Sequence, residues 1–121
     1  MSLVRKPVII RNLESGQSLT VTALVDSGAT LMALPQRAAQ QLGLRSVERR
    51  RFELADRSIL EFDVANVGVT LAGWSGATMC AFGESIAEPL IGVTTLETLF
   101  LALDPVREEL VPVDGLMRGL R

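Results

Sequence analysis

One aspartate stands in a stretch that is otherwise apolar or small. In VTALVDSGATLMALP, residues 21–35, Asp26 ends an apolar run, is followed by Ser27 and Gly28, and precedes further apolar residues. An ionised carboxylate is costly to place among apolar groups unless it is paired or hydrogen-bonded. We therefore expect Asp26 to be buried and to have a chemical task.

The residue types that the chain lacks narrow that task. It has no histidine and a single cysteine, Cys80, which excludes Ser-His-Asp and Cys-His nucleophiles and the usual zinc sites. No phosphate-binding loop of the GxxxxGK[ST] or GxGxxG type occurs. We expect no cofactor and no bound metal, and we expect Cys80 to be a small buried hydrophobe. Any catalysis by this chain has to use carboxylates.

Length and charge define the class of protein. With 121 residues and a net charge of −2, the chain is expected to be one domain over residues 1–121, without the basic surface that nucleic acid requires. The basic segment RSVERRR, residues 45–51, is interrupted by Glu48 and is expected to be a solvated face. No apolar run reaches the length of a secretory signal or a membrane span. We expect a cytoplasmic protein that binds neither nucleic acid nor membrane.

The elements around Asp26 are expected to be mostly strands, because apolar and polar residues alternate along most of the chain. Strands are predicted at residues 7–12, 18–25, 29–34, 52–71 and 77–82, with a terminal hairpin about Asp104 and Pro105, and short helices from Pro35 and from near Thr94.

Three local patterns give sharper expectations. Pro35 suits the first position of a helix that ends before Gly43. Thr94 and Glu97 have the spacing of a capping box. In the segment 52–71, a polar break at residues 55–58 predicts a projecting hairpin, and the apolar alternation changes phase at residues 65–66, which predicts a bulge or a sharp bend.

Four segments in this order resemble the retropepsin-like aspartic proteases, particularly the small single-domain bacterial kind. They are ALVDSGAT, the helix PQRAAQQLGL, the hairpin ELADRSILEF, and PLIG before a second helix. The resemblance spans nearly the whole chain. It implies a mainly β, closed β-barrel-like acid-protease fold with two short helices and a flap hairpin.

The resemblance also implies roles for individual residues. Asp26 would be the catalytic carboxyl, the Ser27 hydroxyl would lock two active-site loops together across a dimer, and Gly28 would leave room for the carboxyl. The implied substrate-binding residues are Ala29, the flap-tip residues Ala55, Asp56 and Arg57, and Leu90 and Ile91, which precede Gly92. The chain departs from the family in having Arg57, and no glycine, at the flap tip.

Peptide hydrolysis by carboxyls needs two of them, one to activate water and one to protonate the amide. The Asp-Ser-Gly motif occurs once in this chain, so the second carboxyl must come from another copy. A two-fold symmetric homodimer would place Asp26 against its own mate. The sequence thus predicts an aspartic endopeptidase that cleaves extended peptides. One alternative is a weak or inactive dimer that serves as a peptide-binding or dimerisation module, and another is a monomeric scaffold with an accidental motif.

Overall fold

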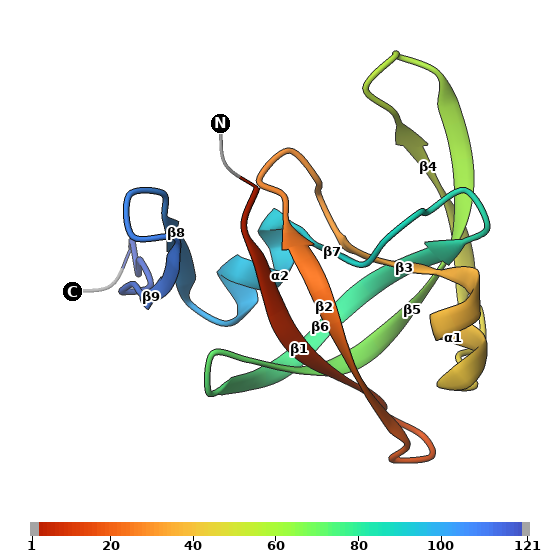
Figure 1. Ribbon diagram of the computed structural model, residues 1–121, viewed down its shortest axis with the longest axis horizontal. Helices are drawn as coiled ribbons and strands as arrows, with labels where there is room; N and C mark the ends of the chain where they lie inside the picture. The colour runs from red at the N-terminus through yellow and green to blue at the C-terminus, as the bar shows by residue number, and fades with distance from the viewer. Residues whose placement is uncertain (1–2, 120–121) are drawn as a thin grey trace.

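The computed structural model of the protein describes residues 3–119. The strands are β1 (Arg5–Asn12), β2 (Ser18–Val25), β3 (Met32–Pro35), β4 (Glu48–Glu53), β5 (Ile59–Leu71), β6 (Trp74–Gly83), β7 (Leu90–Ile91), β8 (Leu101–Asp104) and β9 (Glu109–Pro112), and the helices are α1 (Gln36–Gln41) and α2 (Val93–Thr98) (Figure 1). In this part of the chain, no helix has the length and hydropathy that a membrane crossing needs.

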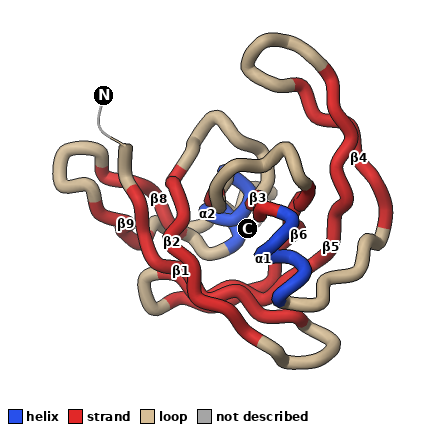
Figure 2. Tube along the Cα trace, turned by 45° about the vertical axis from the view of Figure 1, so that its right-hand side comes forward, coloured by secondary structure: helices blue, strands red, loops and turns tan. Residues whose placement is uncertain are grey.

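Six strands close into a ring. The main sheet has the order β1-β2-β7-β3-β6-β5-β4, and β1 pairs with β5 as well as with β2 (Figure 2). Strand β4 pairs with β5 outside the ring, and together they form a hairpin that projects from the body (Figure 1). The predicted mainly β, closed, barrel-like fold with two short helices is therefore confirmed.

The interior of the ring is a single apolar core. Ile10, Leu34, Val67 and Ile91 are fully buried in it, and so is Cys80. Burial raises the pKa of the Cys80 thiol to about 12. The lone cysteine is thus a buried small hydrophobe, as the sequence predicts.

Strand β5 changes its buried face without a bulge. Phe62 and Val64 belong to a small cluster on one face, whereas Ala65 and Val67 belong to the main core on the other. The ladder with β6 continues without an extra residue from Asp63 to Leu71, so the predicted bulge is wrong. The apolar–polar alternation changes phase because both faces of β5 are covered where it enters the ring. The strand itself curves gradually (Figure 1).

Two expectations for the helix starts also need correction. Pro35 has an extended conformation, with φ −58° and ψ 152°, and caps α1 instead of occupying its first position. Helix α2 begins at Val93 after Gly92, with no side-chain cap hydrogen bond, so the predicted capping box of Thr94 and Glu97 is wrong. The Val93 and Thr94 N–H groups donate instead to carbonyls of the loop after β2.

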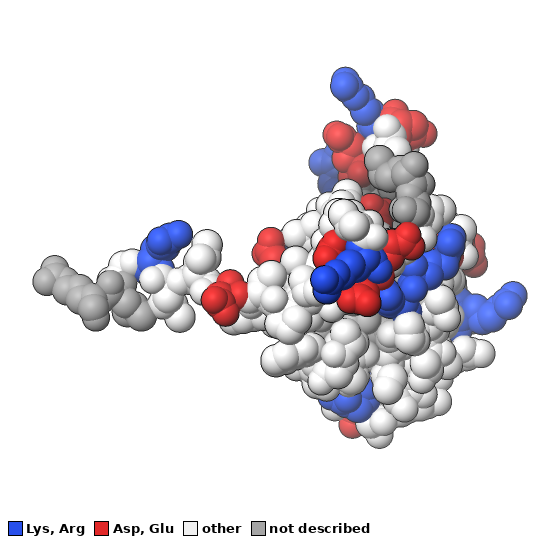
Figure 3. Space-filling model, turned by 60° about the vertical axis from the view of Figure 1, so that its left-hand side comes forward, with Lys and Arg blue, Asp and Glu red and all other residues white. Residues whose placement is uncertain are grey.

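The C-terminal hairpin is a separate two-stranded sheet. Strands β8 and β9 pair only with each other and form an arm beside the body (Figure 1). The segment that follows β9 extends away from the body (Figure 3). Five large apolar side chains of the arm and its flanks are between 43% and 91% exposed: Phe100, Val106, Val113, Leu116 and Met117. The predicted hairpin is confirmed. Leu101, Leu103 and Leu110 pack with the main core, whereas the five exposed side chains lie outside that contact.

Candidate active site

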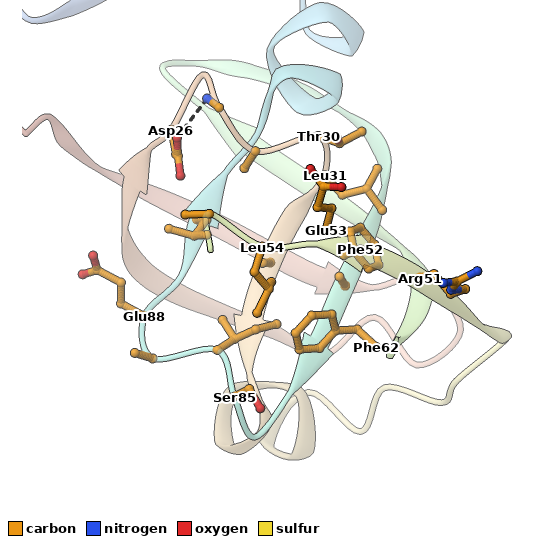
Figure 4. A pocket seen from close by; sticks show the side chains of 18 of the residues that line it. Asp26, Thr30, Leu31, Arg51, Phe52, Glu53, Leu54, Phe62, Ser85 and Glu88 are labelled. Carbon is orange, nitrogen blue, oxygen red and sulfur yellow. Dashed lines mark hydrogen bonds between the residues drawn. The ribbon is translucent and has the colours of Figure 1, made fainter. Parts of the chain in front are cut away.

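Asp26 lies directly after β2, at the start of a loop that runs over residues 26–31. Its Oδ1 accepts a hydrogen bond from the Gly28 N–H at 2.9 Å (Figure 4). The Asp26 side chain is half-buried, and Ser27 and Gly28 are exposed, so the expectation of full burial is wrong for the single chain. The loop lies on an open face, and within residues 3–119 no cation forms an ion pair with Asp26.

The backbone of this loop is held by elements distant in sequence. The Asp26 N–H donates to the Ile91 carbonyl at 2.9 Å, and the Val93 and Thr94 N–H groups donate to the Ala29 and Thr30 carbonyls at 2.9 and 3.0 Å. These bonds tie the loop to β7 and to the first turn of α2. The position of the carboxylate is therefore set by the core of the ring.

Two glycines allow the close packing of this region. A Cβ atom at position 92 would lie 2.5 Å from the Leu31 carbonyl oxygen and 2.8 Å from that of Ala29, which are distances that only a glycine allows. A Cβ atom at position 28 would lie 3.2 Å from Asp26 Oδ1. Gly92 lets β7 pass directly beneath the loop, and Gly28 leaves room for the carboxylate.

A cavity of about 900 Å³ extends from Asp26 beneath the β4–β5 hairpin (Figure 4). Its apolar part uses side chains of the small cluster on the outer face of β5 and β6. These residues are Leu31, Phe52, Leu54, Phe62, Ala81 and Ile86. The hairpin thus forms one wall of a hollow that has the Asp26 carboxylate at one end and this apolar surface beside it.

The tip of the hairpin is stabilised from within. The Leu54 N–H donates to the Ser58 carbonyl and the Arg57 N–H donates to the Leu54 carbonyl, both at 2.8 Å. Arg57 has a φ of +71°, a left-handed conformation that glycine adopts more easily. The Asp56 carboxylate accepts hydrogen bonds from the Ser58 hydroxyl and N–H, which lower the pKa of Asp56.

The sequence profile of a family described as aspartyl protease matches residues 12–92. This stretch contains the loop with Asp26, the hairpin and Gly92, and it covers most of the ring. The chain belongs to the aspartyl protease family. The predicted resemblance to retropepsin-like aspartic proteases is confirmed, and the closed β architecture agrees with an acid-protease fold. No curated protein matches the chain at a significant level.

This member of the aspartyl protease family has six residues that the sequence predicted to bind substrate. They fall into two groups, according to whether they line the cavity. Ala29, Ala55, Arg57 and Leu90 line the cavity. Asp56 and Ile91 do not line it: Asp56 is turned into its own tip, and Ile91 is fully buried in the core beneath the loop.

Several residues of the cavity were not foreseen. The Phe52 and Phe62 rings meet edge to face with centroids 5.6 Å apart, and Leu31 and Ile86 lie with them along the wall. The alternation of Phe52 and Leu54 did predict a strand with one apolar face. The fold is needed to show that this apolar face is directed toward Asp26. The segment 84–88 carries no sequence pattern that would have indicated that it lines the cavity.

Charged side chains also line the cavity. Arg51, Glu53, Arg57 and Glu88 all contribute to its lining, and Glu88 forms an ion pair with Arg5 of β1 at 3.2 Å. Among the described residues, no group of three or more histidine, cysteine, aspartate or glutamate side chains is arranged to hold a metal ion.

Proposed function

We propose that this chain is an aspartic endopeptidase in which two copies of Asp26, one from each subunit of a two-fold symmetric homodimer, share a proton and activate a water molecule. The observation that carries the proposal is the half-buried Asp26 carboxylate, held on a core-anchored loop at the end of a cavity. Membership of the aspartyl protease family supports the same chemistry.

The need for a second carboxyl supports the dimer. Glu53 and Glu88 also line the cavity, but Glu53 belongs to the projecting hairpin and Glu88 is bound by Arg5. A residue near a two-fold axis meets its own equivalent, and the exposed Asp-Ser-Gly turn offers such a surface. In this arrangement the Ser27 hydroxyl bridges the two loops, and the exposed apolar side chains of the β8–β9 arm pack against the second copy.

The pair works as a single acid-base unit. Two carboxyls in contact cannot both be ionised, an effect for which the aspartic proteases are themselves the standard example. The ionised member takes a proton from water as the water oxygen bonds to the peptide carbonyl carbon, and the protonated member donates its proton to the carbonyl oxygen. Collapse of this intermediate breaks the C–N bond: the proton taken from water passes to the leaving nitrogen, and one hydroxyl of the intermediate returns its proton to the carboxylate that had donated one, so the pair again holds a single proton.

The substrate of this proposal is an extended peptide in the cavity. Ala29 and Leu90 contact it from the body, the hairpin tip at Ala55 and Arg57 closes over it as a flap, and an apolar side chain of the peptide enters beside Phe52 and Phe62. Asp56 keeps the tip in shape, and Ile91 supports the loop from below. With one cysteine, which is buried, the chain suits a reducing compartment, and we propose the cytoplasm as its location.

Replacement of Asp26 by Asn tests the catalytic part. Asn keeps the shape and the hydrogen bond from Gly28 but removes the shared proton, so cleavage of unstructured peptides is expected to fall at least roughly a thousandfold while the fold and the dimer persist. Asp114→Asn, in the exposed segment after β9, is the matched control. If Asp26→Asn cleaves as fast as the parent, the catalytic proposal is wrong. If neither protein cleaves but both bind extended peptides as dimers, the binding-module alternative replaces it.

Sedimentation tests the dimer separately. At micromolar concentration the protein is expected to sediment at twice the chain mass. A variant that ends after Ala102 keeps the buried core residues Leu99 and Leu101, lacks the rest of the arm, and is expected to be monomeric. A folded full-length monomer under these conditions would contradict the paired-carboxyl mechanism.

A further inference from the structure

Strand β2 has one edge that is largely unpaired. It pairs with β1 from Ser18 to Leu24, but with β7 only at Leu24 and Val25. The Leu24 N–H donates to Pro89 on the β7 side, and residues two apart in a strand direct their backbone groups to the same edge. The outward backbone groups of Thr20 and Thr22 therefore face this edge, and no backbone bond among residues 3–119 uses them.

The sequence explains why the edge is free. In a parallel ladder, the N–H of residue 89 would reach the carbonyl of Thr22, two residues before the Leu24 contact. Residue 89 is proline and has no N–H. The pairing of β7 with β2 therefore stops, and the segment 84–88 leaves the sheet.

A second hollow of about 580 Å³ lies along this edge. It is formed by β2, the start of α1 and the segment 84–88, and its apolar lining consists of Leu19, Val21, Pro35, Ala38, Ile86 and Ala87. Thr20 and Thr22 are exposed. A free strand edge beside an apolar groove is the arrangement in which proteins bind an extended peptide as an added strand.

The groove shares a wall with the cavity of the candidate active site. Ile86 and Ala87 line both hollows, so the segment 84–88 separates them. A polypeptide that occupies the cavity has this second attachment surface directly beyond the separating wall.

We propose that an extended segment of the protein substrate, outside the stretch that reaches Asp26, adds as a strand to β2 at Thr20 and Thr22 and places apolar side chains in the groove. The identity of this occupant rests on the proposed protease function. Its extended form follows from the free backbone groups, because only a strand presents donors and acceptors at the same two-residue spacing. The enzyme would thus prefer long unfolded chains to short peptides.

A proline at position 20 tests the edge. Thr20→Pro removes only the outward N–H, because the N–H of Thr20 points away from β1, and proline is tolerated at such edge positions. For unfolded β-casein, the variant is expected to lose roughly tenfold in kcat/KM through a higher KM. A short peptide that spans one cleaved bond of β-casein is expected to be cleaved at an unchanged rate. Thr20→Ala keeps the N–H and is the matched control.

Hydrogen exchange tests the same inference without cleavage and without a change in β2. In the Asp26→Asn protein with saturating β-casein, the Thr20 and Thr22 amides are expected to become protected. The Val21 amide, already paired with β1, is the internal reference.

Unchanged exchange at Thr20 and Thr22 overturns the inference. If the flap amides of residues 54–58 are protected in that case, the proposed protease site stands by itself. If Thr20 and Thr22 become protected but the parent protein cleaves nothing, the groove does bind an extended chain and the proposed protease function is wrong.

Discussion

The loop with Asp26 and the tip of the flap hairpin face the same cavity but are held in opposite ways. Besides its own internal bonds, the loop is tied by three backbone hydrogen bonds to β7 and α2, more than sixty residues further along the chain. The flap tip is closed by bonds among residues 54–58 alone. The carboxylate is therefore positioned by the core, whereas the hairpin can move as a unit without breaking any bond of its tip.

The two regions also use glycine differently. The loop depends on Gly28 and Gly92 because other atoms approach them closely, while the flap tip carries Arg57 in a left-handed conformation that glycine would adopt without strain. Substitutions at these positions therefore compare a loop of fixed geometry with a hairpin that we propose to act as a moving flap.

The largest effect is expected for Gly92→Ala. The added methyl group meets backbone atoms of Leu31 and Ala29 that cannot move independently of the loop, so we expect a loss of about 3 kcal/mol or more in the free energy of unfolding. Urea denaturation measures it. At Gly76 an added Cβ would meet mainly the end of the Leu99 side chain, so Gly76→Ala should lose about 1 kcal/mol or less. Equal losses would show that the loop is not held as tightly as its bonds indicate.

A smaller effect, confined to activity, is expected for Gly28→Ala. The new methyl group would lie 3.2 Å from Asp26 Oδ1, so the carboxylate must shift by a few tenths of an ångström. We expect roughly tenfold slower peptide cleavage, because small misplacements of a reacting group slow catalysis strongly, with a stability change below about 1 kcal/mol. Parallel measurement of kcat/KM and of urea unfolding separates the two effects. A large loss of stability with normal cleavage per folded molecule would contradict this expectation.

Asp56→Ala should affect only the flap. It removes the acceptor for the Ser58 N–H and hydroxyl, so the Ser58 amide is expected to exchange faster while the Val25 amide is unchanged. Hydrogen exchange read by NMR measures both amides. Equal acceleration at both would mean that the tip is coupled to the core.

The pH dependence of the tip follows from the same hydrogen bonds. They lower the pKa of Asp56 below its ordinary value of 3.8, so their contribution to the folded tip is fully present above pH 3.8 and is lost as the pH falls through the lowered pKa. At the mildly acidic pH expected to suit a carboxyl pair, the tip stays capped. Exchange of the Ser58 amide, corrected for its intrinsic pH dependence, should therefore be constant above pH 4.

The smallest net effect is expected for Arg57→Gly. Glycine removes about 1 kcal/mol of left-handed strain but adds freedom to the unfolded chain, so the free energy of unfolding should change by less than about 1 kcal/mol. The tip amides should nevertheless exchange faster, because glycine also loosens the turn in the folded state. Unchanged exchange would show that Arg57 does not limit the mobility of the flap.

The sequence predicted the strands and turns that depend only on residues close together in the chain. Alternation along residues 18–25 and 52–71 identified β2 and β5, the polar break at residues 55–58 identified the hairpin tip, and the Asp-Ser-Gly turn identified the end of β2. The first strand of the hairpin was predicted only from Phe52, whereas β4 begins at Glu48 within the exposed basic segment. The capping box at Thr94 failed because the α2 N–H groups find their partners in a loop more than sixty residues earlier.

Features made by distant contacts could not be predicted in the same way. The apolar faces of Phe52 and Phe62 were visible in the sequence, but their direction toward Asp26 depends on the closure of the ring. The phase change in β5 does not by itself distinguish a bulge from a strand covered on both faces, because the two arrangements give the same apolar pattern in the sequence.

The burial of Cys80 makes it a natural reporter of the opening of the ring. Its strand pairs with β3 at Met32 and with β5 at Ala65, and the thiol, with a pKa raised to about 12, is neither accessible nor ionised in the folded protein. A thiol-specific reagent can react with it only after these strands separate. The rate of labelling at increasing reagent concentration therefore gives the frequency with which the barrel opens, with no fluorescent group or mutation added.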